Sequence, residues 1–230
     1  MTTVDRLRQL VLDGSEPRQK LPSEGKLAES LGVSRLTIRE ALKELSGKGL
    51  VELHRGKTAV VREPDSVLLS DYFKTAIQRD SRRMFELLEI RRALEGLATE
   101  LAAKNGSRAA ISAIEASLDE MSLALESGLD SSASDVSFHE ALALASGNRM
   151  LAFILEGLAD ALLETFKLSA QGRKARGGEI KETLNAHRVI FEFVKRGDAK
   201  SATKSMSSHL KDAEYDLNSA IRASGDENKS

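Results

Sequence analysis

Three histidines and one aspartate in the C-terminal two thirds of the chain have types and spacing that suit a metal site. Asp135 and His139 are four residues apart, so both project from one face of a helix. His187 and His209 each lie about 11 residues from the break at Gly197-Asp198, so two helices that fold back there bring both to one level, about 16 Å from the turn. These four residues predict a divalent metal site. Imidazole and carboxylate ligands suit zinc, our first choice, and also nickel, manganese or iron.

The alternative is that each histidine is an ordinary polar residue. A single histidine on an apolar helix face is more often a hydrogen-bonded core residue than a metal ligand. We favour the metal site because three histidines and one aspartate meet by helical register, and not one by one.

Arg91 is a candidate for binding an anionic effector. It falls on the inward stripe of a predicted helix together with Leu87, Leu94 and Ala98, so its guanidinium group would be buried. A buried guanidinium needs an anion, and a bidentate contact to the carboxylate of a small effector would supply one. Glu95, four residues further on, would supply one equally well, so both partners stay open.

Basic residues in the N-terminal part of the chain are placed as in a DNA-binding element. Arg35, Arg39 and Lys43 recur every four residues on one helix face, and Arg55-Gly56-Lys57 forms the tip of a predicted β-hairpin. Residues 33–62 hold seven Lys or Arg against three Glu, a local net charge of +4 in a chain whose net charge is −1. A solvated helix face would explain the three helical charges alone. Their location and the further charges at the hairpin tip favour double-stranded DNA as the partner.

The elements that would hold these basic residues form a winged helix-turn-helix over residues 21–62. Ser23 fits the start of a first helix, Gly32 the turn, and Ser34 the start of a second helix. The second helix has an apolar face at a spacing of three and four residues, and short alternating runs flank the hairpin tip. This order of elements places the second helix in a DNA groove.

The same segment resembles the GntR family of bacterial winged-helix transcription regulators over about residues 4–62. The resemblance rests on the motifs Leu21-Pro22-Ser23-Glu24, Ser34-Arg35, Arg39-Glu40-Ala41-Leu42 and Gly49-Leu50-Val51. It implies DNA contacts from the second helix and from the wing, namely Ser34, Arg35, Thr37, Arg39, Arg55, Gly56 and Lys57. Gly25 departs from the family pattern, which usually has an arginine that touches DNA at this position. We therefore expect that contact to be missing.

The composition changes after this segment. Glu63-Pro64-Asp65-Ser66 is a short linker, and no proline follows it. Residues 67–222 predict about six antiparallel helices separated by glycine-containing breaks. One apolar stripe consists of Leu87, Ile90, Leu94, Leu97 and Leu101, and another of Phe153, Leu155, Leu158, Leu162 and Phe166. We expect a mainly α protein with three parts: a winged helix-turn-helix domain over 1–65, an all-α antiparallel bundle that binds metal and effector over 66–222, and a polar, disordered tail over 223–230.

The helical part resembles the FCD effector domain that one branch of the GntR family carries, over about residues 80–215. The resemblance rests on Glu89-Ile90-Arg91-Arg92-Ala93-Leu94-Glu95, on Asp135, Phe138 and His139 followed by Ser146-Gly147-Asn148, and on His187-Arg188, Met206 and His209. In metal-binding members the matching Asp and three His hold a divalent cation, and an organic-acid effector binds at or beside it. All four positions are filled here. Ala186 stands where an acidic residue is common, which would weaken the support behind the ligands.

Composition limits the other possibilities. The chain has no cysteine, which removes disulfides and thiolate chemistry and fits a reducing cytosol. No apolar run approaches the roughly 20 residues of a membrane span, and the first residues pattern as an amphipathic helix and not as a signal peptide, so we expect a cytoplasmic protein. Residues 1–65 hold 12 basic and 10 acidic residues, a net charge of only +2, so tight DNA binding should depend on a homodimer.

These patterns predict a metabolite-responsive transcription regulator, which we take to be a repressor. It would bind a palindromic double-stranded DNA operator as a homodimer and respond to a small carboxylate. One alternative is a metal-dependent hydrolase with a DNA-binding appendage; against it, Glu140 points about 100° away from His139 around the helix and is badly placed as a general base. The other alternative is a constitutive DNA binder with a purely structural metal.

Overall fold

The computed structural model describes residues 1–14, 16–80 and 82–227. The chain divides into two units between Leu68 and Leu69, close to the domain boundary expected at residue 65. None of the described helices has both the length and the hydrophobicity that a membrane span requires.

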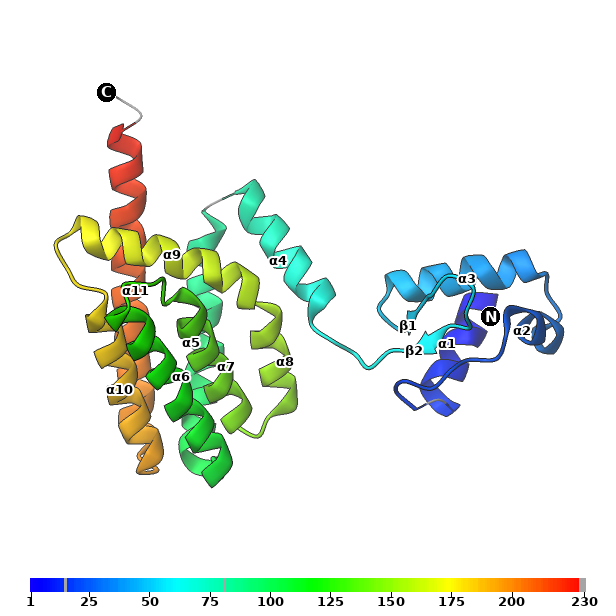
Figure 1. Ribbon diagram of the computed structural model, residues 1–230, viewed down its shortest axis with the longest axis horizontal. Helices are drawn as coiled ribbons and strands as arrows, with labels where there is room; N and C mark the ends of the chain where they lie inside the picture. Colours follow the sequence, from blue (N-terminus) through cyan, green and yellow to red (C-terminus); the bar gives the residue numbers. More distant parts are fainter. Residues whose placement is uncertain (15, 81, 228–230) are drawn as a thin grey trace. The chain divides into compact units, whose positions relative to one another are not determined.

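The described part of the N-terminal unit holds three helices and one hairpin (Figure 1). They are α1 (Thr3–Gly14), α2 (Glu24–Leu31), α3 (Arg35–Gly47), β1 (Val51–Glu52) and β2 (Val60–Val61). The two strands pair antiparallel with Val51 opposite Val61, and Lys20 adds a single bridge to Val60. This is the predicted winged helix-turn-helix, with the wing between β1 and β2.

Local sequence signals set the ends of α2 and α3. The Ser23 hydroxyl accepts a hydrogen bond from the Lys26 N–H, and the Ser34 hydroxyl accepts one from the Thr37 N–H, so each helix start has a donor satisfied by its cap. Gly32 ends α2 with a φ of 67°, a left-handed conformation that glycine adopts without steric cost. The apolar faces of the helices meet in one core, which includes Leu7, Leu27, Ile38, Leu42 and Leu45.

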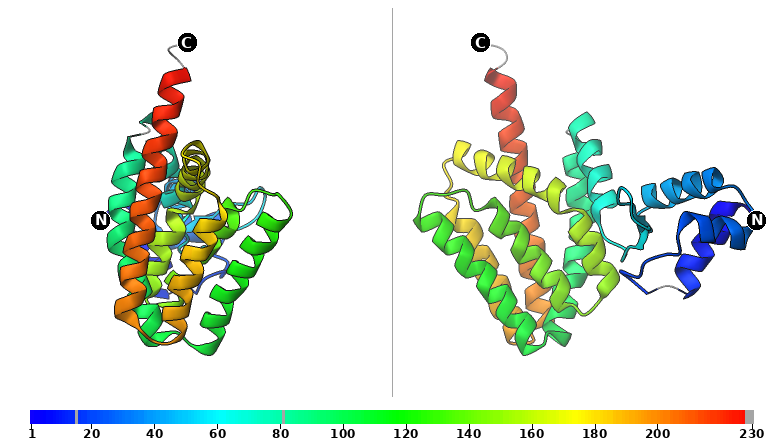
Figure 2. Two further views of the ribbon diagram at one scale, coloured as in Figure 1. Left: turned by 90° about the vertical axis from the view of Figure 1, so that its left-hand side faces the viewer. Right: turned by 45° about the vertical axis from the view of Figure 1, so that its right-hand side comes forward.

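The described part of the C-terminal unit is a bundle of helices without strands (Figures 1 and 2). The helices are α4 (Val67–Arg79), α5 (Arg83–Asn105), α6 (Arg108–Glu126), α7 (Ser132–Ala145), α8 (Arg149–Gly157), α9 (Ala159–Ala175), α10 (Lys181–Lys195) and α11 (Ala199–Glu227). The long α11 packs against α5, α9 and α10, while α7 packs against α5, α6 and α9. The all-α bundle expected from the sequence is confirmed, and α9 crosses the long helices at a steep angle (Figure 1).

The bundle contains more helices than the sequence suggests. The apolar repeat from Phe153 to Phe166 reads as one helix, but α8 ends at Gly157 and α9 begins at Ala159. Leu158 lies at the bend and is fully buried, and both helices turn their apolar side chains into the same core, so the repeat continues across the break.

The last helix is also longer than expected. The sequence predicts a polar tail from residue 223, whereas α11 continues to Glu227. Residues 223–227 are therefore helical in the structure, and residues 228–230 of the predicted tail lie outside the described part of the chain.

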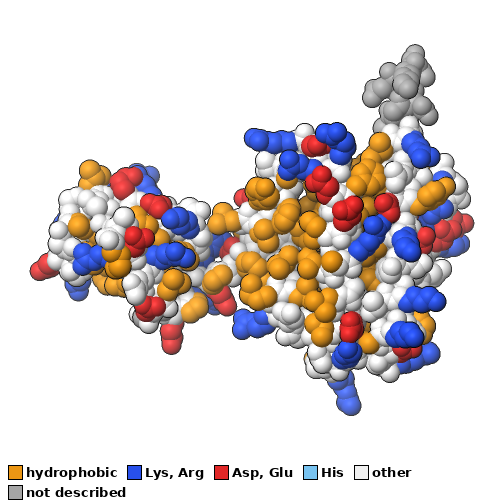
Figure 3. All heavy atoms as spheres, turned by 180° about the vertical axis from the view of Figure 1, so that it is seen from behind, with side chains coloured by type: hydrophobic (Ala, Val, Ile, Leu, Met, Phe, Trp, Pro, Cys, Tyr) orange, Lys and Arg blue, Asp and Glu red, His pale blue; other side chains and the backbone are white. Residues whose placement is uncertain are grey.

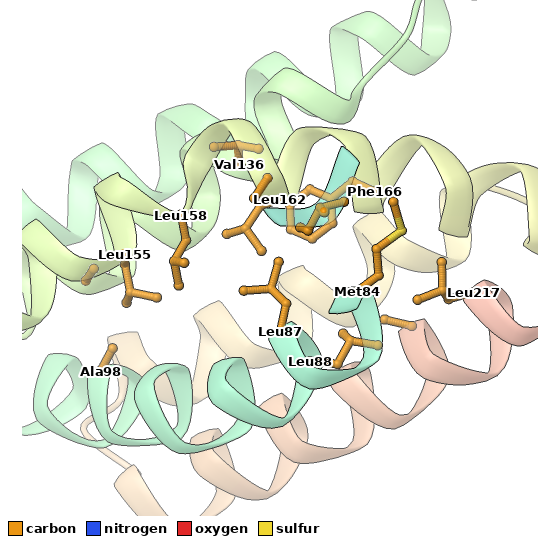
Figure 4. Packing of buried hydrophobic residues seen from close by; sticks show 14 of the residues in the cluster. Met84, Leu87, Leu88, Ala98, Val136, Leu155, Leu158, Leu162, Phe166 and Leu217 are labelled. Atoms are coloured by element: carbon orange, nitrogen blue, oxygen red, sulfur yellow. The ribbon is translucent and has the colours of Figure 1, made fainter. Parts of the chain in front are cut away.

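Two clusters of buried apolar side chains fill the bundle. The first, shown in Figure 4, joins α5, α7, α8, α9 and α11 and includes Met84, Leu87, Val136, Leu155, Leu162, Phe166 and Leu217. The second joins α6, α7, α10 and α11 and includes Ile114, Phe138, Ile190, Met206 and Leu210. On α5, Leu87, Arg91 and Ala98 face the interior as predicted. Ile90 and Leu97 were expected on the same stripe, but they are 42% and 44% exposed because they lie on the outer side of the helix.

Gly172 is a position in the bundle with no room for a side chain. A Cβ atom at this position would lie 1.8 Å from the Asp216 carbonyl oxygen and 2.8 Å from the Ala220 nitrogen, both on α11. Backbone atoms cannot move aside as a flexible side chain does, so we expect Gly172→Ala to force α9 from α11 and to lower the free energy of unfolding by about 3 kcal/mol. Urea unfolding followed by circular dichroism measures the loss.

Gly96→Ala on α5 is the matched control. The nearest neighbour of a Cβ atom there is Thr203 Cγ2 at 4.0 Å, an ordinary contact, so alanine should leave stability unchanged or raise it slightly. Equal losses in the two variants would contradict the argument from space.

Candidate metal centre and candidate DNA interface

Three imidazole rings from three different helices meet in the interior of the C-terminal unit. His139 lies on α7, His187 on α10 and His209 on α11, and each is at most 6% exposed. Their ligand nitrogen atoms all lie within 4.8 Å of one another, and the Nε2 atoms of His187 and His209 are 3.2 Å apart. The structure thus brings together His187 and His209, which the sequence register places at one level, and adds His139 from a third helix.

Asp135 joins the cluster from one turn earlier on α7. Its Oδ1 atom lies 3.3 Å from His139 Nε2 and 3.6 Å from His187 Nε2. This oxygen is buried and has no hydrogen-bond partner among the described residues. A buried polar atom without a partner is uncommon in folded proteins and indicates a missing ion or water. Ligands about 2.1 Å from one ion stand roughly 3 to 4 Å apart, so this donor set fits a divalent metal.

Burial keeps two of the rings in the form that binds metal. Loss of solvent lowers the pKa of His187 and of His209 well below the ordinary value, so both rings are neutral at pH 7 and offer a nitrogen lone pair. For Asp135, burial raises the pKa, but the neighbouring His187 and His139 rings lower it by more, which keeps the carboxyl group ionised. For His139, burial lowers the pKa, and the carboxylates of Glu95 and Asp135 raise it above the ordinary value.

Arg91 reaches the same centre from α5 and is fully buried. Its Nε atom donates a hydrogen bond to Glu95 Oε1 at 2.6 Å, so the internal ion pair, one of its two expected partners, is present. The guanidinium group is not fully used by this pair. Its Nη2 atom lies 3.4 Å from His139 Nε2, and its Nη1 atom is buried without a hydrogen-bond partner among the described residues. Arg91 therefore keeps a donor for a second anion.

Glu95 has a second contact, with His139, that the sequence does not indicate directly. Its Oε2 atom lies 2.7 Å from His139 Nδ1, while its Oε1 atom accepts from Arg91. A carboxylate behind a ligating imidazole fixes the orientation of the ring and makes it a stronger ligand. Glu95 supports the His139 ring and does not replace the acidic residue expected at Ala186, next to His187. The Nδ1 atom of His187 is buried and has no hydrogen-bond partner among the described residues. The sequence holds one signal for the contact of Glu95. Glu95 is four residues from Arg91, so helical spacing places both on the same buried face of α5.

The N-terminal unit presents the expected DNA contacts on the outer face of α3. Arg35, Thr37 and Arg39 are exposed, whereas Ile38 of the same helix is fully buried. Ser34 is the cap of the helix, and its hydroxyl also lies 2.8 Å from the Thr37 hydroxyl. Ser34 therefore has a structural role in addition to any contact with DNA.

The wing tip is an exposed turn. The Lys57 N–H donates to the His54 carbonyl at 3.1 Å, and Gly56 has a φ of 73°, in the left-handed region that favours glycine. Arg55, Gly56 and Lys57 are all exposed. The wing, α3 and the start of α2 line a groove of about 730 Å³. Its arginine and lysine side chains suit contact with DNA phosphates.

Arg39 has a partner that the sequence does not indicate. Its Nε and Nη2 atoms donate to the two carboxylate oxygens of Glu24 at 3.2 and 2.8 Å. These hydrogen bonds lower the pKa of Glu24 and raise that of Arg39, so both groups are charged. The two residues are 15 apart in the sequence, and no helical spacing signals the contact.

Comparisons with known proteins cover both units. The description "Bacterial regulatory proteins, gntR family" matches residues 2–61, and "FCD domain" matches residues 86–212. The HTH-type transcriptional regulator LutR of Bacillus subtilis (strain 168) is 32% identical over 86% of this chain and 91% of its own length. The Glc operon transcriptional activator of Escherichia coli (strain K12) is 29% identical over 93% of this chain and 86% of its own. A solved structure described as Streptococcus agalactiae GntR is 27% identical, with a TM-score of 0.71, over 91% of this chain and 96% of its own.

These matches agree with the two units described above, a winged helix-turn-helix followed by an all-α bundle. The two similar proteins named above, LutR and the Glc operon transcriptional activator, are transcription regulators. This chain belongs to the GntR family of bacterial transcription regulators and carries an FCD domain as its C-terminal part.

Proposed function

We propose that this regulator binds a palindromic operator and represses transcription. We propose further that a small carboxylate, bound beside a divalent metal in the helical domain, changes the affinity of the regulator for DNA. The observation that carries the proposal is the buried centre. Asp135 Oδ1 and Arg91 Nη1 lie there beside three histidines, and neither atom has a hydrogen-bond partner among the described residues. Protein interiors rarely keep donors and acceptors unpaired unless a ligand meets them.

The winged helix supplies the DNA contacts in this proposal. Arg35 and Arg39 at the start of α3 read base edges, and the wing contacts the backbone. The full set of contacts is Ser34, Arg35, Thr37, Arg39, Arg55, Gly56 and Lys57. We propose that DNA binding lowers transcription, because a dimer bound to an operator that overlaps a promoter excludes RNA polymerase. One similar protein is named as an activator, so a promoter–reporter assay with and without the chain is the direct measurement of sign.

The metal ligands in this proposal are Asp135, His139, His187 and His209. When bound, the ion supplies a Lewis-acidic point to which a carboxylate oxygen coordinates. Zinc is our first choice, and nickel, manganese and iron suit the same donors. Glu95 holds the His139 ring from behind, and the apolar clusters on either side of the centre exclude water from it.

Charge balance favours a singly charged carboxylate as the effector. With neutral imidazoles, the centre holds two carboxylates, from Asp135 and Glu95, against one guanidinium group, from Arg91. A divalent cation converts this excess negative charge into one positive charge. One bound carboxylate neutralises this positive charge. Neutralisation is favourable because an uncompensated charge in a buried site is unstable. The free donor of Arg91 supplies a hydrogen bond to the same carboxylate.

Helix α9 connects this centre with the start of the helical domain. Its Phe166 ring lies 4.6 Å from the Arg91 guanidinium, and at its other end Asp160 accepts a hydrogen bond from Ser70 of α4 at 2.9 Å. Residues 62–66 lead from the wing directly into α4. An effector that moves Phe166 therefore acts on the segment that joins the two units. Coupling of this kind is typically about 1 to 3 kcal/mol.

The hydrolase alternative needs a general base at the centre. Glu140 is the neighbour of His139 in the sequence and therefore points about 100° away from it around α7. Burial and the carboxylate of Glu156 on α8 raise the pKa of Glu140. Together with the family membership, this favours the regulator over the hydrolase.

We propose the outer side of α5 as the contact between two copies of the chain. Ile90, Ala93 and Leu97 recur there at three and four residues and are all exposed. Figure 3 looks onto this side of the helical domain and shows hydrophobic side chains gathered on it. A second copy is the expected occupant, because a palindromic operator needs two winged helices and a two-fold contact pairs one surface with itself.

Introducing charge on this side should separate the dimer. In the double variant Ile90→Glu and Leu97→Glu, like charges would face one another across the two-fold axis, so we expect a monomer by light scattering and operator affinity lower by at least tenfold, about 1.4 kcal/mol. Leu123→Glu on α6 is the control, since Leu123 is 65% exposed but lies on another helix. A double variant that stays dimeric would refute this choice of surface.

Metal binding should depend on the buried histidines and not on the histidine in the wing. At a metal concentration 100 times its dissociation constant, we expect the metal to stabilise the chain by about 2.7 kcal/mol and to raise its melting temperature by about 5 to 10 °C. His187→Ala should abolish this shift and the metal content measured by elemental analysis. His54→Ala removes the exposed wing histidine and should retain both. Retained metal in His187→Ala would show that the ligand set is wrong.

The proposed function is tested with the full, metal-loaded chain. We expect selection from randomised duplexes to yield a palindrome, and we expect a small carboxylate from a panel to change the affinity for it by about 5- to 150-fold. Arg91→Lys is the informative variant, because it keeps a positive charge for Glu95 and loses the free Nη1 donor. It should weaken carboxylate binding in calorimetry about tenfold or more while metal content stays unchanged. No heat from any carboxylate in the metal-loaded chain would favour a structural metal.

A further inference from the structure

The first two residues of α2 contact the two arginines that we assign to base reading. Glu24 accepts hydrogen bonds from Arg39 at 3.2 Å from Nε and 2.8 Å from Nη2. Gly25 lies beneath Arg35, because a Cβ atom built on Gly25 would meet Arg35 Nη2 at 3.2 Å, and Cζ and Nε at 3.4 Å. All four residues line the groove between α3 and the wing.

We propose that Glu24 and Gly25 position the guanidinium groups of Arg39 and Arg35, and that the start of α2 thereby determines how strictly α3 discriminates between base pairs. This inference rests on the DNA contacts proposed above for Arg35 and Arg39. It assigns a role to two residues that need not touch a base themselves.

The geometry of the Glu24–Arg39 pair leaves the base-reading edge of the guanidinium group open. Glu24 takes the side that carries Nε and one N–H of Nη2. Nη1 and the other N–H of Nη2 form the opposite, end-on edge, which is the edge that makes a bidentate contact to guanine O6 and N7. The carboxylate therefore holds the arginine without competing for the donors that a guanine needs.

The main chain of Glu24 lies at a capped helix start. Glu24 is the first residue of α2, and the Ser23 hydroxyl caps this helix by accepting from the Lys26 N–H at 3.3 Å. Arg39 has a side chain that is 55% exposed and would otherwise sample many rotamers. Holding it before DNA arrives reduces the entropy lost on binding.

The same carboxylate has an opposing effect on affinity. A negative charge in the groove repels phosphate, so Glu24 weakens binding to DNA of any sequence. Positioning of Arg39 acts only where the matching base pair is present. The repulsion weakens specific and non-specific binding alike, whereas the positioning strengthens specific binding alone, so the two effects are separable by experiment.

Gly25 controls the position of Arg35 by leaving space. At 3.2 Å, a contact with even a methyl group at residue 25 is tighter than normal packing, so the guanidinium group would have to shift. An arginine at this position, as in the usual family pattern, would also place a like charge against Arg35. The glycine therefore does more than remove one DNA contact, because it allows Arg35 to lie over the start of α2.

The test uses the full chain and the palindrome selected by the unaltered protein, with dissociation constants measured for that duplex and for every single-base-pair change in it. Glu24→Gln is expected to raise affinity for unrelated DNA and to reduce discrimination at the base pair read by Arg39 about fivefold or more. Combined with Arg39→Ala, it should cause no further loss of discrimination, as expected for residues that act through one contact. Glu29→Gln is the control, because Glu29 is an exposed acid of the same helix with no side-chain partner among those described.

The matching experiment on Gly25 compares alanine and arginine at this position. Gly25→Ala and Gly25→Arg should change discrimination at the base pair read by Arg35 and leave the other positions of the palindrome as they were. Gly47→Ala is the control, since a Cβ atom at Gly47 meets nothing within 4 Å. Thermal melting of each variant checks that the winged helix is folded.

The outcomes separate this inference from the proposed function. If the unaltered chain selects a palindrome and loses discrimination with Arg39→Ala and Arg35→Ala, but Glu24→Gln and Gly25→Arg keep full discrimination, the positioning role is refuted and the DNA contacts stand. If the two arginine variants keep full discrimination, the DNA contacts fail, and the positioning role fails with them.

Discussion

The constraint on which the C-terminal unit depends is the burial of ionisable groups inside an all-helical core. Arg91, Glu95 and His139 are at most 2% exposed, and burial of this kind is unfavourable unless the groups satisfy one another or a ligand. Large apolar clusters lie on both sides of the centre. The Phe138 ring stacks on the His187 ring at 4.2 Å, and the first cluster contributes Phe166 from α9. Apolar packing thus holds four helices in the one register that keeps the polar groups together.

This arrangement links ligand binding to helix position. The donors come from α5, α7, α10 and α11, so a ligand that draws them together changes the packing of several helices at once. Helix α9 contributes no ligand, yet it contacts the centre through Phe166, and its Asp160 accepts a hydrogen bond from Ser70 of α4. Just before α9, Leu69 of α4 packs so closely on Gly157, the last residue of α8, that a Cβ atom there would lie 2.5 Å from it. A close contact of this kind transmits small movements better than a loose one, because packed interiors are stiff. These contacts connect the centre with α4, the helix that follows the linker between the two units.

Local geometry explains which parts of this structure were predictable. The level of His187 and His209 followed from counting residues on either side of one turn, and the caps of α2 and α3 followed from single serines. The side of α5 that carries Ile90 was predicted wrongly, because apolar periodicity shows that a helix has an apolar face but not which neighbours cover it. The bend at Leu158 was missed for the same reason, since the core on both sides of the bend is continuous. Contacts within one helix or one hairpin were therefore accessible from the sequence, and contacts set by packing angles were not.

The pairing of Glu24 with Arg39 belongs to the second kind, since it depends on the angle at which α2 meets α3. This pair is relevant to specific DNA recognition, because the winged helix has a net charge of only +2 over residues 1–65. A weakly charged domain gains little from phosphate attraction, so we expect its affinity for random DNA to be low and its search to be less hindered by non-specific binding. Discrimination must then come from a few contacts made at low entropic cost. In the positioning role proposed above, Glu24 has both effects. Its charge weakens non-specific binding, and its hydrogen bonds order the Arg39 side chain before DNA binds.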